Sequence, residues 1–489
     1  MKKTTLLALV VLLGIAPRCA MAEPGDLLQT FLNPRGTTYP SGSHFWVRGG
    51  VTAVGENLLV GFPFDDTFGA DAGIAYLFDA STGEVLRTFK SPNPAVDGNF
   101  GCSVAAVENR VLIGAYHEPT EHVKRAGNAY IFDASTGKLL HTLVKPSRAA
   151  DDRFGWPATV LGENFVVSSK WDDTGAKDAG AVFTYDSSTG ELLQAFRRPE
   201  PVADEGFGSA IAAVGENLIV GDYRDDTKGP NAGAAYLFDG GTGELLHTFY
   251  NPEPGRKNGF AFAVAALSNN VLVVDKSFHP THAHGGVVYL FDGVTGELMR
   301  TFCNPAPAIE DGFGQSVAAV GGNVLVSANH ANANGFNVGA AYLFDGSSGK
   351  PLHTFLNPTP AWDDHFGLTV AALGNNLVIT APFDDTAGID GGAVYLFEGG
   401  SSAEFKAHEP PVTKAETPTT RLYVRTSPPG AKVHLDGQPI GTSPGLFFAP
   451  PGDCSVTVEL KGYEPHSQPV KVISGQITRV EVQLERTAP

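Results

Sequence analysis

Four pairs of neighbouring aspartates, each followed by threonine, are the clearest candidates for chemistry in this sequence. Paired carboxylates can hold Ca²⁺, a hard ion that prefers oxygen ligands. The same side chains can instead accept hydrogen bonds from the amides of their own loop, as Asx turns. A motif that recurs in several copies favours this structural role. The pairs are Asp65 and Asp66, Asp172 and Asp173, Asp225 and Asp226, and Asp384 and Asp385.

Histidines form a second group of candidate ligands. His279, His282 and His284 follow the spacing H-x-x-H-x-H, and imidazole nitrogens at such a spacing can bind Zn²⁺. A polar loop with incidental histidines is the alternative, because Asp275 is the only local carboxylate candidate and no cysteine is fixed nearby. Other copies of the same loop also contain histidine, namely His117, His122 and His330.

Familiar catalytic motifs are absent from the sequence. It contains no G-x-S-x-G nucleophile, no P-loop and no dinucleotide fingerprint. His117 and His122 are five residues apart with Pro119 between them, so they cannot share one helical face as zinc peptidase ligands do. Carboxylate pairs also serve glycosidases and lyases, but such a site is expected to be one asymmetric cluster rather than a repeated motif.

Internal repeats are the strongest signal in the sequence. A marker phenylalanine recurs at intervals of 55, 54, 53, 53, 53 and 53 residues. An aromatic residue follows each marker after 29–31 residues, and a proline precedes six markers by eight residues. Three markers in one register indicate seven copies of one unit. The marker residues are Phe45, Phe100, Phe154, Phe207, Phe260, Phe313 and Phe366.

The fourth copy shows how one unit reads as structure. Alternating small and apolar residues predict short strands, and Gly-rich segments at 215–217 and 239–243 predict tight turns between them. A polar loop over 222–233 separates the second strand from the third and contains one of the aspartate pairs. The strands expected in this copy are 208–214, 218–221, 234–238 and 244–250.

Four short antiparallel strands in each of seven copies, without a helical period, predict an all-β fold of the seven-bladed β-propeller type. The Phe-Gly pair that opens a copy, Phe207-Gly208 in the fourth, supplies a ring to fill the space between blades and a residue without Cβ for close backbone approach. Loops alternate between the two faces of such a blade. The aspartate loops therefore share a face with the proline-bearing connectors.

The two ends of the repeat array predict how it closes. Residues 26–34 read DLLQTFLNP and match the fourth-strand segments ELLHTFYNP (244–252) and PLHTFLNP (351–358). The last copy shows three strands through Phe397 and then changes sequence. We therefore expect the N-terminal strand to complete the last blade, which removes two sheet edges and closes the ring.

The units F-G-x-S-V-A-A-V, V-G and A-Y-L-F-D resemble FG-GAP repeats, the type that builds the propeller of integrin α chains, over residues 26–398. The resemblance is to the bacterial group without a calcium loop, because the turn between the first two strands is short, as in VGEN (54–57). It implies a secreted or surface protein that binds partners.

The hairpin FDASTGEVLRTF (78–89) is also similar to quinoprotein dehydrogenase repeats. Those enzymes stack a tryptophan in every blade, whereas the four tryptophans here do not share one repeat position: Trp46, Trp156, Trp171 and Trp362.

Residues 421–486 resemble a PEGA domain, through SPPGAKVHLDGQPIGTSP (427–444) and the later Gly462-Tyr463. The resemblance implies an exported accessory module without known catalysis. Alternating residues predict a small β-sandwich, with a hairpin turn at Asp436-Gly437. The expected strands are 421–426, 432–435, 455–460, 470–473 and 478–484.

The expected domain organisation of the whole chain has four parts. It consists of a signal peptide (1–22), a propeller (23–398), a flexible linker (399–420) and a β-sandwich (421–489).

The N-terminus predicts export. Lys2 and Lys3 precede an apolar run over 6–16, and Ala20-Met21-Ala22 is a small-x-small site, which together are typical of a Sec-type signal peptide. Arg18 and Pro17 disfavour a lipoprotein anchor at Cys19. No later stretch reaches the roughly 18–20 apolar residues of a membrane span.

The cysteines that remain after the signal peptide are Cys102, Cys303 and Cys454. They are odd in number and widely separated in the sequence, which does not suggest a disulfide framework.

Composition limits the class of partner. The 34 Lys+Arg and 52 Asp+Glu residues give a formal charge of -18, which disfavours nucleic acid and anionic lipid, since phosphate binding needs clustered cations. Hydrophobic residues make up 42% of the chain, enough for packed cores and against global disorder.

These observations predict a monomeric protein that is periplasmic, attached to the cell surface or secreted. We expect it to bind without catalysis, presenting its aspartate-loop face to an extracellular protein or glycan. A hydrolase or lyase of extracellular polysaccharide acting at the same face is the alternative. A metal-dependent adhesion module is the third hypothesis. No cofactor is expected, with Ca²⁺ at the aspartate pairs as the alternative.

Overall fold

The structure is a computed structural model, in which the chain forms two compact units, residues 1–410 and 411–489. Its described residues contain β-strands and one short 3-10 helix, η1 (Asp385–Ala387). No helix among them has the length and apolarity needed to cross a membrane. The described residues are 22–34, 50–120, 123–253, 259–276, 286–308, 311–333, 335, 337–388, 391–401, 404–405, 421–443, 445–448, 452–473 and 477–487.

Several residues and segments singled out in the sequence lie outside these ranges. They are the signal peptide up to residue 21, Phe45, Trp46, His122, His279, His282, His284 and the linker residues 402–403 and 406–420.

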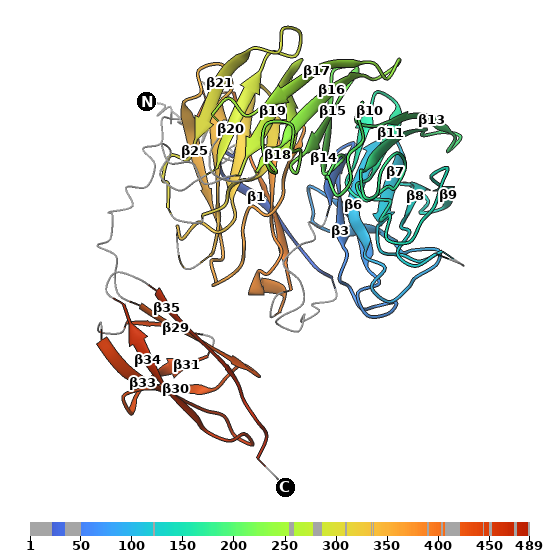
Figure 1. Cartoon of the computed structure of the whole chain (residues 1–489). Coiled ribbons are helices and arrows are strands. Elements are labelled where there is room, and N and C mark those ends of the chain that lie inside the picture. Colours follow the sequence, from blue (N-terminus) through green and yellow to red (C-terminus); the bar gives the residue numbers. More distant parts are fainter. Residues whose placement is uncertain are drawn as a thin grey trace, which may run out of the picture. The chain divides into compact units, whose positions relative to one another are not determined.

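The first unit is built from four-stranded antiparallel sheets on a common plan. In all but one, four strands consecutive in the chain pair in chain order, and Figure 1 shows such sheets standing beside one another. The short strands follow from the alternation of buried and half-exposed residues between glycine-rich turns. The strands are β2 (Val51–Val54), β3 (Asn57–Phe62), β4 (Ile74–Asp79) and β5 (Val85–Phe89); β6 (Phe100–Val107), β7 (Arg110–Ala115), β8 (Asn128–Asp133) and β9 (Leu139–Leu143); β10 (Ala158–Leu161), β11 (Asn164–Ser169), β12 (Ala181–Asp186) and β13 (Leu192–Phe196); β14 (Ala210–Val214), β15 (Asn217–Asp222), β16 (Ala234–Asp239) and β17 (Leu245–Tyr250); β18 (Phe260–Leu267), β19 (Asn270–Asp275), β20 (Val287–Phe291) and β21 (Leu298–Cys303); and β22 (Phe313–Val320), β23 (Asn323–Ala328), β24 (Ala340–Asp345) and β25 (Pro351–Leu356).

The exceptional sheet joins the two ends of the repeat array. It pairs β1 (Leu27–Leu32) with β28 (Ala393–Phe397), followed by β27 (Asn376–Ala381) and β26 (Val370–Leu373). Thr30 lies opposite Tyr395 in this antiparallel ladder. The N-terminal segment therefore pairs with the last repeat, as its sequence predicts.

The apolar cores lie between neighbouring sheets. Phe207 is fully buried in a cluster that contains Val166 of β11 and Tyr236 of β16, so the marker ring fills the space between two sheets as expected. A further cluster combines Phe31 of β1 with Phe78 of β4, whose ring centroids are 5.5 Å apart. The last sheet thus packs against the first.

Glycine permits the closest approach between sheets. Gly233 precedes β16 with a φ of +80°, and a Cβ built on it would lie 2.2 Å from the carbonyl oxygen of Phe260 in the next sheet. Gly208, beside the marker Phe207, has a φ of +88°, and its Cβ would lie 2.4 Å from Ser168 Oγ. Any side chain at these positions would push two sheets apart.

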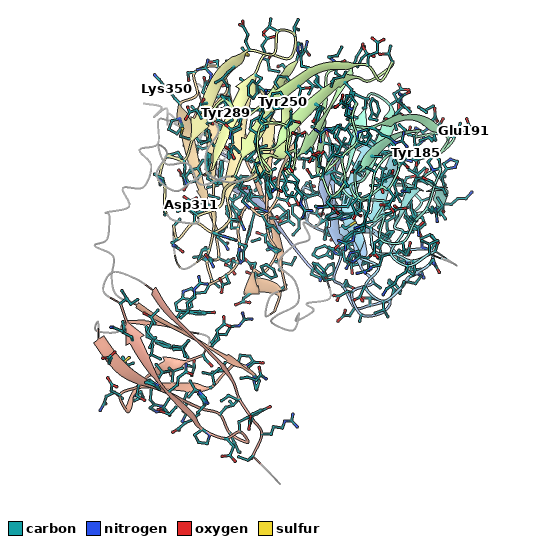
Figure 2. The ribbon with its side chains drawn as sticks, in the orientation of Figure 1. Tyr185, Glu191, Tyr250, Tyr289, Asp311 and Lys350 are labelled. Atoms are coloured by element: carbon teal, nitrogen blue, oxygen red, sulfur yellow. The ribbon has the colours of Figure 1, made fainter. Side chains whose placement is uncertain are left out.

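The two ends of each sheet carry different connections. The hairpin between the third and fourth strands is held by an aspartate, and in the fourth copy Asp239 Oδ1 accepts the N–H groups of Gly241 and Thr242 at 3.1 and 2.7 Å. The predicted hairpin turn at 239–243 is therefore confirmed. Figure 2 shows Lys350, in such a hairpin, and Asp311, in a connector, at opposite ends of the sheets.

The second unit packs two sheets on one core, as predicted for residues 421–489. One sheet has the order β32-β29-β35 and the other β31-β30-β33-β34, and buried residues such as Val424 and Val458 form their common core. The Asp436-Gly437 turn is present, because Leu435 pairs with Gln438. The strands β31 and β32 were not expected. The strands are β29 (Arg421–Ser427), β30 (Lys432–Leu435), β31 (Gln438–Thr442), β32 (Gly445–Phe448), β33 (Gly452–Glu459), β34 (His466–Val472) and β35 (Ile477–Gln483).

Candidate functional site

The first aspartate of each predicted pair is buried and bonded to its own loop. The four residues have no exposed surface, and each Oδ1 accepts the N–H of the threonine two residues later at 2.8–2.9 Å. This is the Asx-turn geometry. The residues are Asp65, Asp172, Asp225 and Asp384.

The second aspartate of each pair lies at the protein surface. In three loops its Oδ1 accepts a backbone N–H five residues later, for example that of Asp71 on Asp66 at 2.8 Å. One oxygen thus shapes the loop while the carboxylate stays exposed to solvent. The surface residues are Asp66, Asp173, Asp226 and Asp385.

In three of the four loops, those of Asp172, Asp225 and Asp384, the second oxygen of the buried aspartate contacts a residue of the neighbouring sheet. The residue before each connector proline points at an acidic group of the next copy, and we call it the connector residue. In the last copy Asn357 donates to Asp364 and Asp384 at 2.7 and 3.3 Å, and the Tyr395 hydroxyl donates to Asp384 at 2.6 Å. In the second copy Glu118 takes the aspartate's place and bonds the connector residue Ser91. The acid loops therefore lock one sheet to the next.

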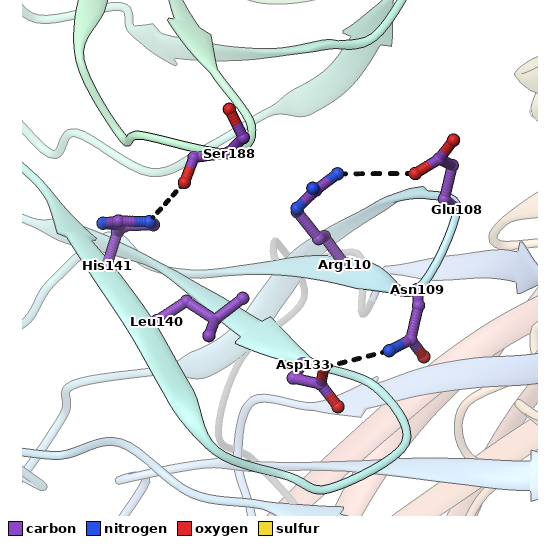
Figure 3. A pocket seen from close by; sticks show the side chains of 7 residues that line it. All are labelled: Glu108, Asn109, Arg110, Asp133, Leu140, His141 and Ser188. Atoms are coloured by element: carbon purple, nitrogen blue, oxygen red, sulfur yellow. Dashed lines mark hydrogen bonds and ion pairs between the residues drawn. The ribbon is translucent and has the colours of Figure 1, made fainter.

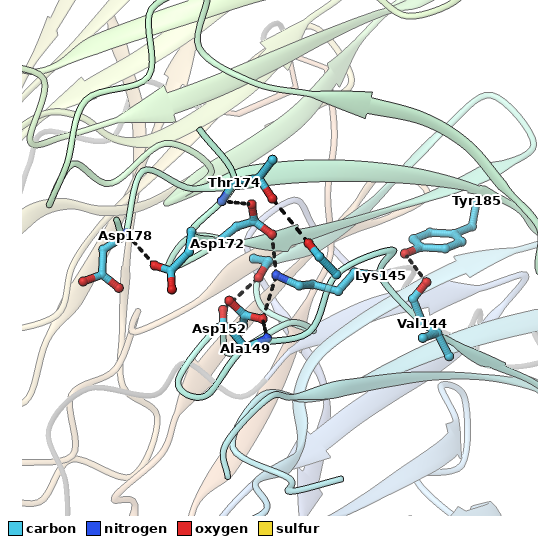
Figure 4. A network of polar contacts seen from close by, with 11 residues as sticks. Val144, Lys145, Ala149, Asp152, Asp172, Thr174, Asp178 and Tyr185 are labelled. Atoms are coloured by element: carbon cyan, nitrogen blue, oxygen red, sulfur yellow. Dashed lines mark hydrogen bonds and ion pairs between the residues drawn. The ribbon is translucent and has the colours of Figure 1, made fainter. Parts of the chain in front are cut away.

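The third copy contains the most charged version of this lock (Figure 4). Its connector residue Lys145 has a side chain 2% exposed. The ammonium group pairs with Asp152 at 2.8 Å and also contacts Asp172. Phe183 stands where Tyr236 and Tyr395 of other copies donate a hydroxyl to the buried aspartate. Lysine thus supplies the donor that this copy lacks.

Burial and charge act in opposite directions on these carboxyls. Burial disfavours the ionised form of Asp172, yet the hydrogen bond and charge of Lys145 hold its pKa below the usual value. Burial dominates at Asp152 and raises its pKa. Neither carboxylate has exposed surface, so this group stabilises the contact between two neighbouring sheets and is not available to a ligand.

The fourth copy brings three buried carboxylates together, and among the described residues they form the one group that could ligate a metal ion. Oxygens of Glu205, Asp222 and Asp225 lie within 4.8 Å of one another. The guanidinium of the connector residue Arg198 contacts Glu205 and lies 3.3 Å from Asp225. Carboxylate oxygens fit Ca²⁺, but Arg198 already supplies a cation there.

Asp222 is the least compensated member of this group. It accepts the N–H groups of Gly206 and Arg224 at 2.9 and 3.2 Å. Its Oδ2 is buried and has no hydrogen-bond partner in the described part of the chain. Burial is the main cause that raises its pKa to about 6, from a usual 3.8, and the charge of Asp225 adds to it.

Replacing Asp222 with asparagine is expected to stabilise the protein above pH 6. The pKa of Asp222 is higher in the folded protein than in the unfolded chain, so between about pH 4 and 6 the folded protein binds more protons. The free energy of unfolding therefore falls as pH rises from about 4 to 6, and above pH 6 the buried Asp222 carboxylate is ionised and destabilises the fold. Asp222→Asn should raise the free energy of unfolding by about 1–2 kcal/mol at pH 7.5 and by much less at pH 4.5. Urea unfolding at both pH values measures this difference.

The exposed neighbour Asp226 provides the matched control. Asp226→Asn should change the free energy of unfolding by less than about 0.5 kcal/mol at either pH. Stability curves of Asp222→Asn and wild type that run parallel between pH 4.5 and 7.5 would contradict the burial of an ionised Asp222.

Histidines of the described loops do not form a metal group with carboxylates or cysteine. The ring of His117 stacks on Tyr116 at 3.9 Å, and burial lowers its pKa to about 4. The ring of His330 lies 4.8 Å from that of His365, and burial lowers the pKa of His365 to about 3. The rings of His117 and His365 are therefore neutral at pH 7.

Aromatic and cationic side chains gather beside the aspartate loops, and sequence reasoning missed this group. We call it the aromatic–cation cluster. Lys170 Nζ lies 4.9 Å from the ring centroid of Trp171 and 5.1 Å from that of Trp156. The guanidinium carbon of Arg224 lies 5.2 Å from the Trp171 centroid. The cluster consists of Arg153, Trp156, Lys170, Trp171, Tyr223 and Arg224, all half-buried.

The sequence contains one signal that could have indicated this cluster, namely two neighbouring positions of the repeat at which the residue types vary. The residues 16 and 17 positions after a marker phenylalanine follow the second strand and open the aspartate loop. From the second to the last copy they differ although the flanking strands repeat, and in the first copy the residues before the aspartate pair are Pro63 and Phe64, the same types as in the last copy. Across consecutive copies they are Tyr116 and His117, Lys170 and Trp171, Tyr223 and Arg224, Asn329 and His330, and Pro382 and Phe383, with Lys276 at the first position in the fifth copy.

A pocket of about 360 Å³ lies at the opposite end of the sheets (Figure 3). His141 Nε2 donates to the carbonyl oxygen of Ser188 in the next sheet at 2.8 Å. Asn109 donates to Asp133 at 3.0 Å. The same joint recurs where His247 bonds the carbonyl of Val294 at 2.7 Å. These polar groups are part of a repeated contact between sheets.

Comparison with known proteins identifies both parts of the chain. Residues 199–238, 307–344 and 360–397 match the FG-GAP repeat, and residues 419–488 match the PEGA domain. A crystal structure of the computationally designed Ika8 protein is similar at 15% identity, with a TM-score of 0.44, over 72% of this chain and 83% of that one. No curated protein matches the sequence.

Proposed function

Because the chain carries FG-GAP repeats and a C-terminal PEGA domain, we propose that it is an exported binding protein without catalytic activity. Both families are typical of extracellular or periplasmic proteins. In this proposal residues 1–22 direct export, 399–420 link the two modules, and the monomer presents the aspartate-loop face of its β-propeller to an extracellular protein or glycan.

We further propose that the propeller has seven blades and is closed by its N-terminal strand. The pairing of β1 with β28 supports closure. So does the core shared by Phe31, Leu396 and Tyr76, which belong to the last and first sheets. A closed ring has no free edge strands and provides a rigid support for loops that vary.

One observation carries the binding function: on the aspartate-loop face, repeated residues are used inside the fold and variable residues reach the surface. Asp172 and Asp225 are buried in joints between sheets, whereas the adjacent Trp171 and Arg224 differ from copy to copy and are half-buried. Variable loops on a rigid repeated scaffold are typical of binding surfaces.

Array screening tests this function. The exported chain from residue 23 is applied to glycan and protein arrays with and without EDTA. We expect saturable binding to one class of ligand, unaffected by EDTA, because the buried loop acids already have protein partners. Binding that EDTA abolishes would instead indicate the metal-dependent adhesion module.

A polysaccharide hydrolase or lyase is the second candidate, favoured by one observation. Glu205, Asp222 and Asp225 form a single carboxylate group that the other copies do not reproduce in the described residues, and the raised pKa of Asp222 suits a general acid. Their complete burial argues against contact with a sugar. This hypothesis predicts that Asp222→Asn abolishes polysaccharide cleavage.

A further inference from the structure

We propose that the aromatic–cation cluster binds a carboxylate-bearing oligosaccharide. This inference rests on the proposed binding function and assigns its ligand class. The cluster is formed by two neighbouring copies: Arg153, Trp156, Lys170 and Trp171 flank β10 and β11, and Tyr223 and Arg224 follow β15. Lys170-Trp171 and Tyr223-Arg224 open the same loops that contain the exposed Asp173 and Asp226.

Trp171 is the centre of the cluster. The charged groups of Arg153, Lys170 and Arg224 lie 5.5, 4.9 and 5.2 Å from its ring centroid. Arg224 also lies 5.4 Å from the ring centroid of Tyr223. A guanidinium stacked on a ring keeps its N–H edge free of the ring plane, so it can still bind a carboxylate in bidentate fashion.

Charge around the cluster points to an anionic ligand. It brings three positive side chains together in a chain with a formal charge of -18. No carboxylate of the described residues forms an ion pair with Arg153 or Arg224. Like charges held around one ring repel each other, and a bound anion would remove that repulsion.

Unsatisfied donors provide a second, independent observation. Trp171 Nε1 and Arg153 Nε have no hydrogen-bond partner within the described ranges of the chain. Buried donors are nearly always bonded in proteins. A ligand rich in hydroxyl and carboxylate oxygens would supply acceptors for them.

The rings select a sugar rather than another anion. Half-buried Trp156, Trp171 and Tyr223 offer flat faces on which the C–H face of a pyranose ring can stack. The aromatic series continues on one side to half-buried Phe262, 6.5 Å from Tyr223, and on the other side the buried Tyr116 supports Trp156 at 6.2 Å. This length favours an oligosaccharide over a single sugar.

Calorimetric titration with a galacturonic acid oligomer of defined length tests the ligand class. The matched probe is the same oligomer with its carboxylates reduced to primary alcohols. We expect the acidic oligomer to bind at least about tenfold more tightly, and its affinity to fall as salt is added. Polyglutamate is the third probe and should bind more weakly than the acidic oligomer, since it has no sugar face to stack.

Variants test the site. Trp171→Ala and Arg224→Gln should each weaken binding of the acidic oligomer at least about tenfold, and Arg224→Lys should retain more affinity than Arg224→Gln. The matched controls are Trp362→Ala, an exposed tryptophan of another copy, and Arg110→Gln at the opposite end of the sheets. Both controls should bind as wild type does, and thermal unfolding verifies that every variant is folded.

Three results would overturn the inference: equal affinity for the reduced oligomer, wild-type affinity in folded Arg224→Gln and Trp171→Ala, or equally tight binding of polyglutamate. If array ligands still bind the cluster variants normally, the ligand class is wrong and the binding function stands. If the arrays show no ligand at all, the binding function itself fails.

Discussion

Replacing Lys145 with methionine is expected to lower the free energy of unfolding by about 3–5 kcal/mol at pH 7.5. The substitution keeps the length of the side chain but removes the ammonium group between Asp152 and Asp172. Two buried carboxylates would then lack their counter-ion. Urea unfolding of the whole chain measures the loss, and it should shrink at pH 4.5, where the uncompensated carboxyls can take up protons.

Lys177 provides the control for this prediction. Its side chain is 74% exposed beside Asp178 and Asp204, so Lys177→Met should cost less than about 1 kcal/mol. Equal losses for the two methionine variants would contradict the role of Lys145 as a buried joint between sheets.

A double substitution tests whether lysine replaces the missing tyrosine. Lys145→Asn with Phe183→Tyr would rebuild the arrangement of the last copy, in which Asn357 and Tyr395 both donate to Asp384. We expect the double variant to be more stable than Lys145→Asn alone by about 1–2 kcal/mol. No recovery would show that the donors of different copies are not equivalent.

Removing the ring of Phe31 should also be costly, because this residue connects the last sheet to the first. Phe31 is 1% exposed and lies in the core with Phe78 and Val394. Phe31→Ala should lower the free energy of unfolding by about 3–5 kcal/mol. Denaturant unfolding measures the effect.

Leu28, on the same strand and 38% exposed, is the matched control. Leu28→Ala should change stability by less than about 1 kcal/mol. If Phe31→Ala is tolerated as well as Leu28→Ala, the N-terminal strand does not contribute a core between the first and last sheets.

Much of the fold is predictable because each copy repeats the same local signals. The fourth copy illustrates this: the strands expected at 218–221 and 234–238 are observed as Asn217–Asp222 and Ala234–Asp239. Alternation and glycine turns act within one copy, so their meaning does not depend on distant residues. The likeness of residues 26–34 to the fourth strands also predicts the pairing with β28.

The contacts between copies could not be predicted in the same way. Lys145 meets Asp172 across 27 positions, and Trp171 meets Arg224 from the next copy. Such contacts depend on how one sheet is placed against another, which no single copy encodes. The tryptophans do not recur at one repeat position, and residues that break a repeat are candidates for function rather than packing.

Incubation of the chain from residue 23 with its array-identified ligand tests the central claim most directly. Calorimetry should show saturable binding while chromatography recovers the ligand intact, without new reducing or unsaturated sugar ends. Accumulation of cleaved product in molar excess over the protein would contradict the account and identify an enzyme.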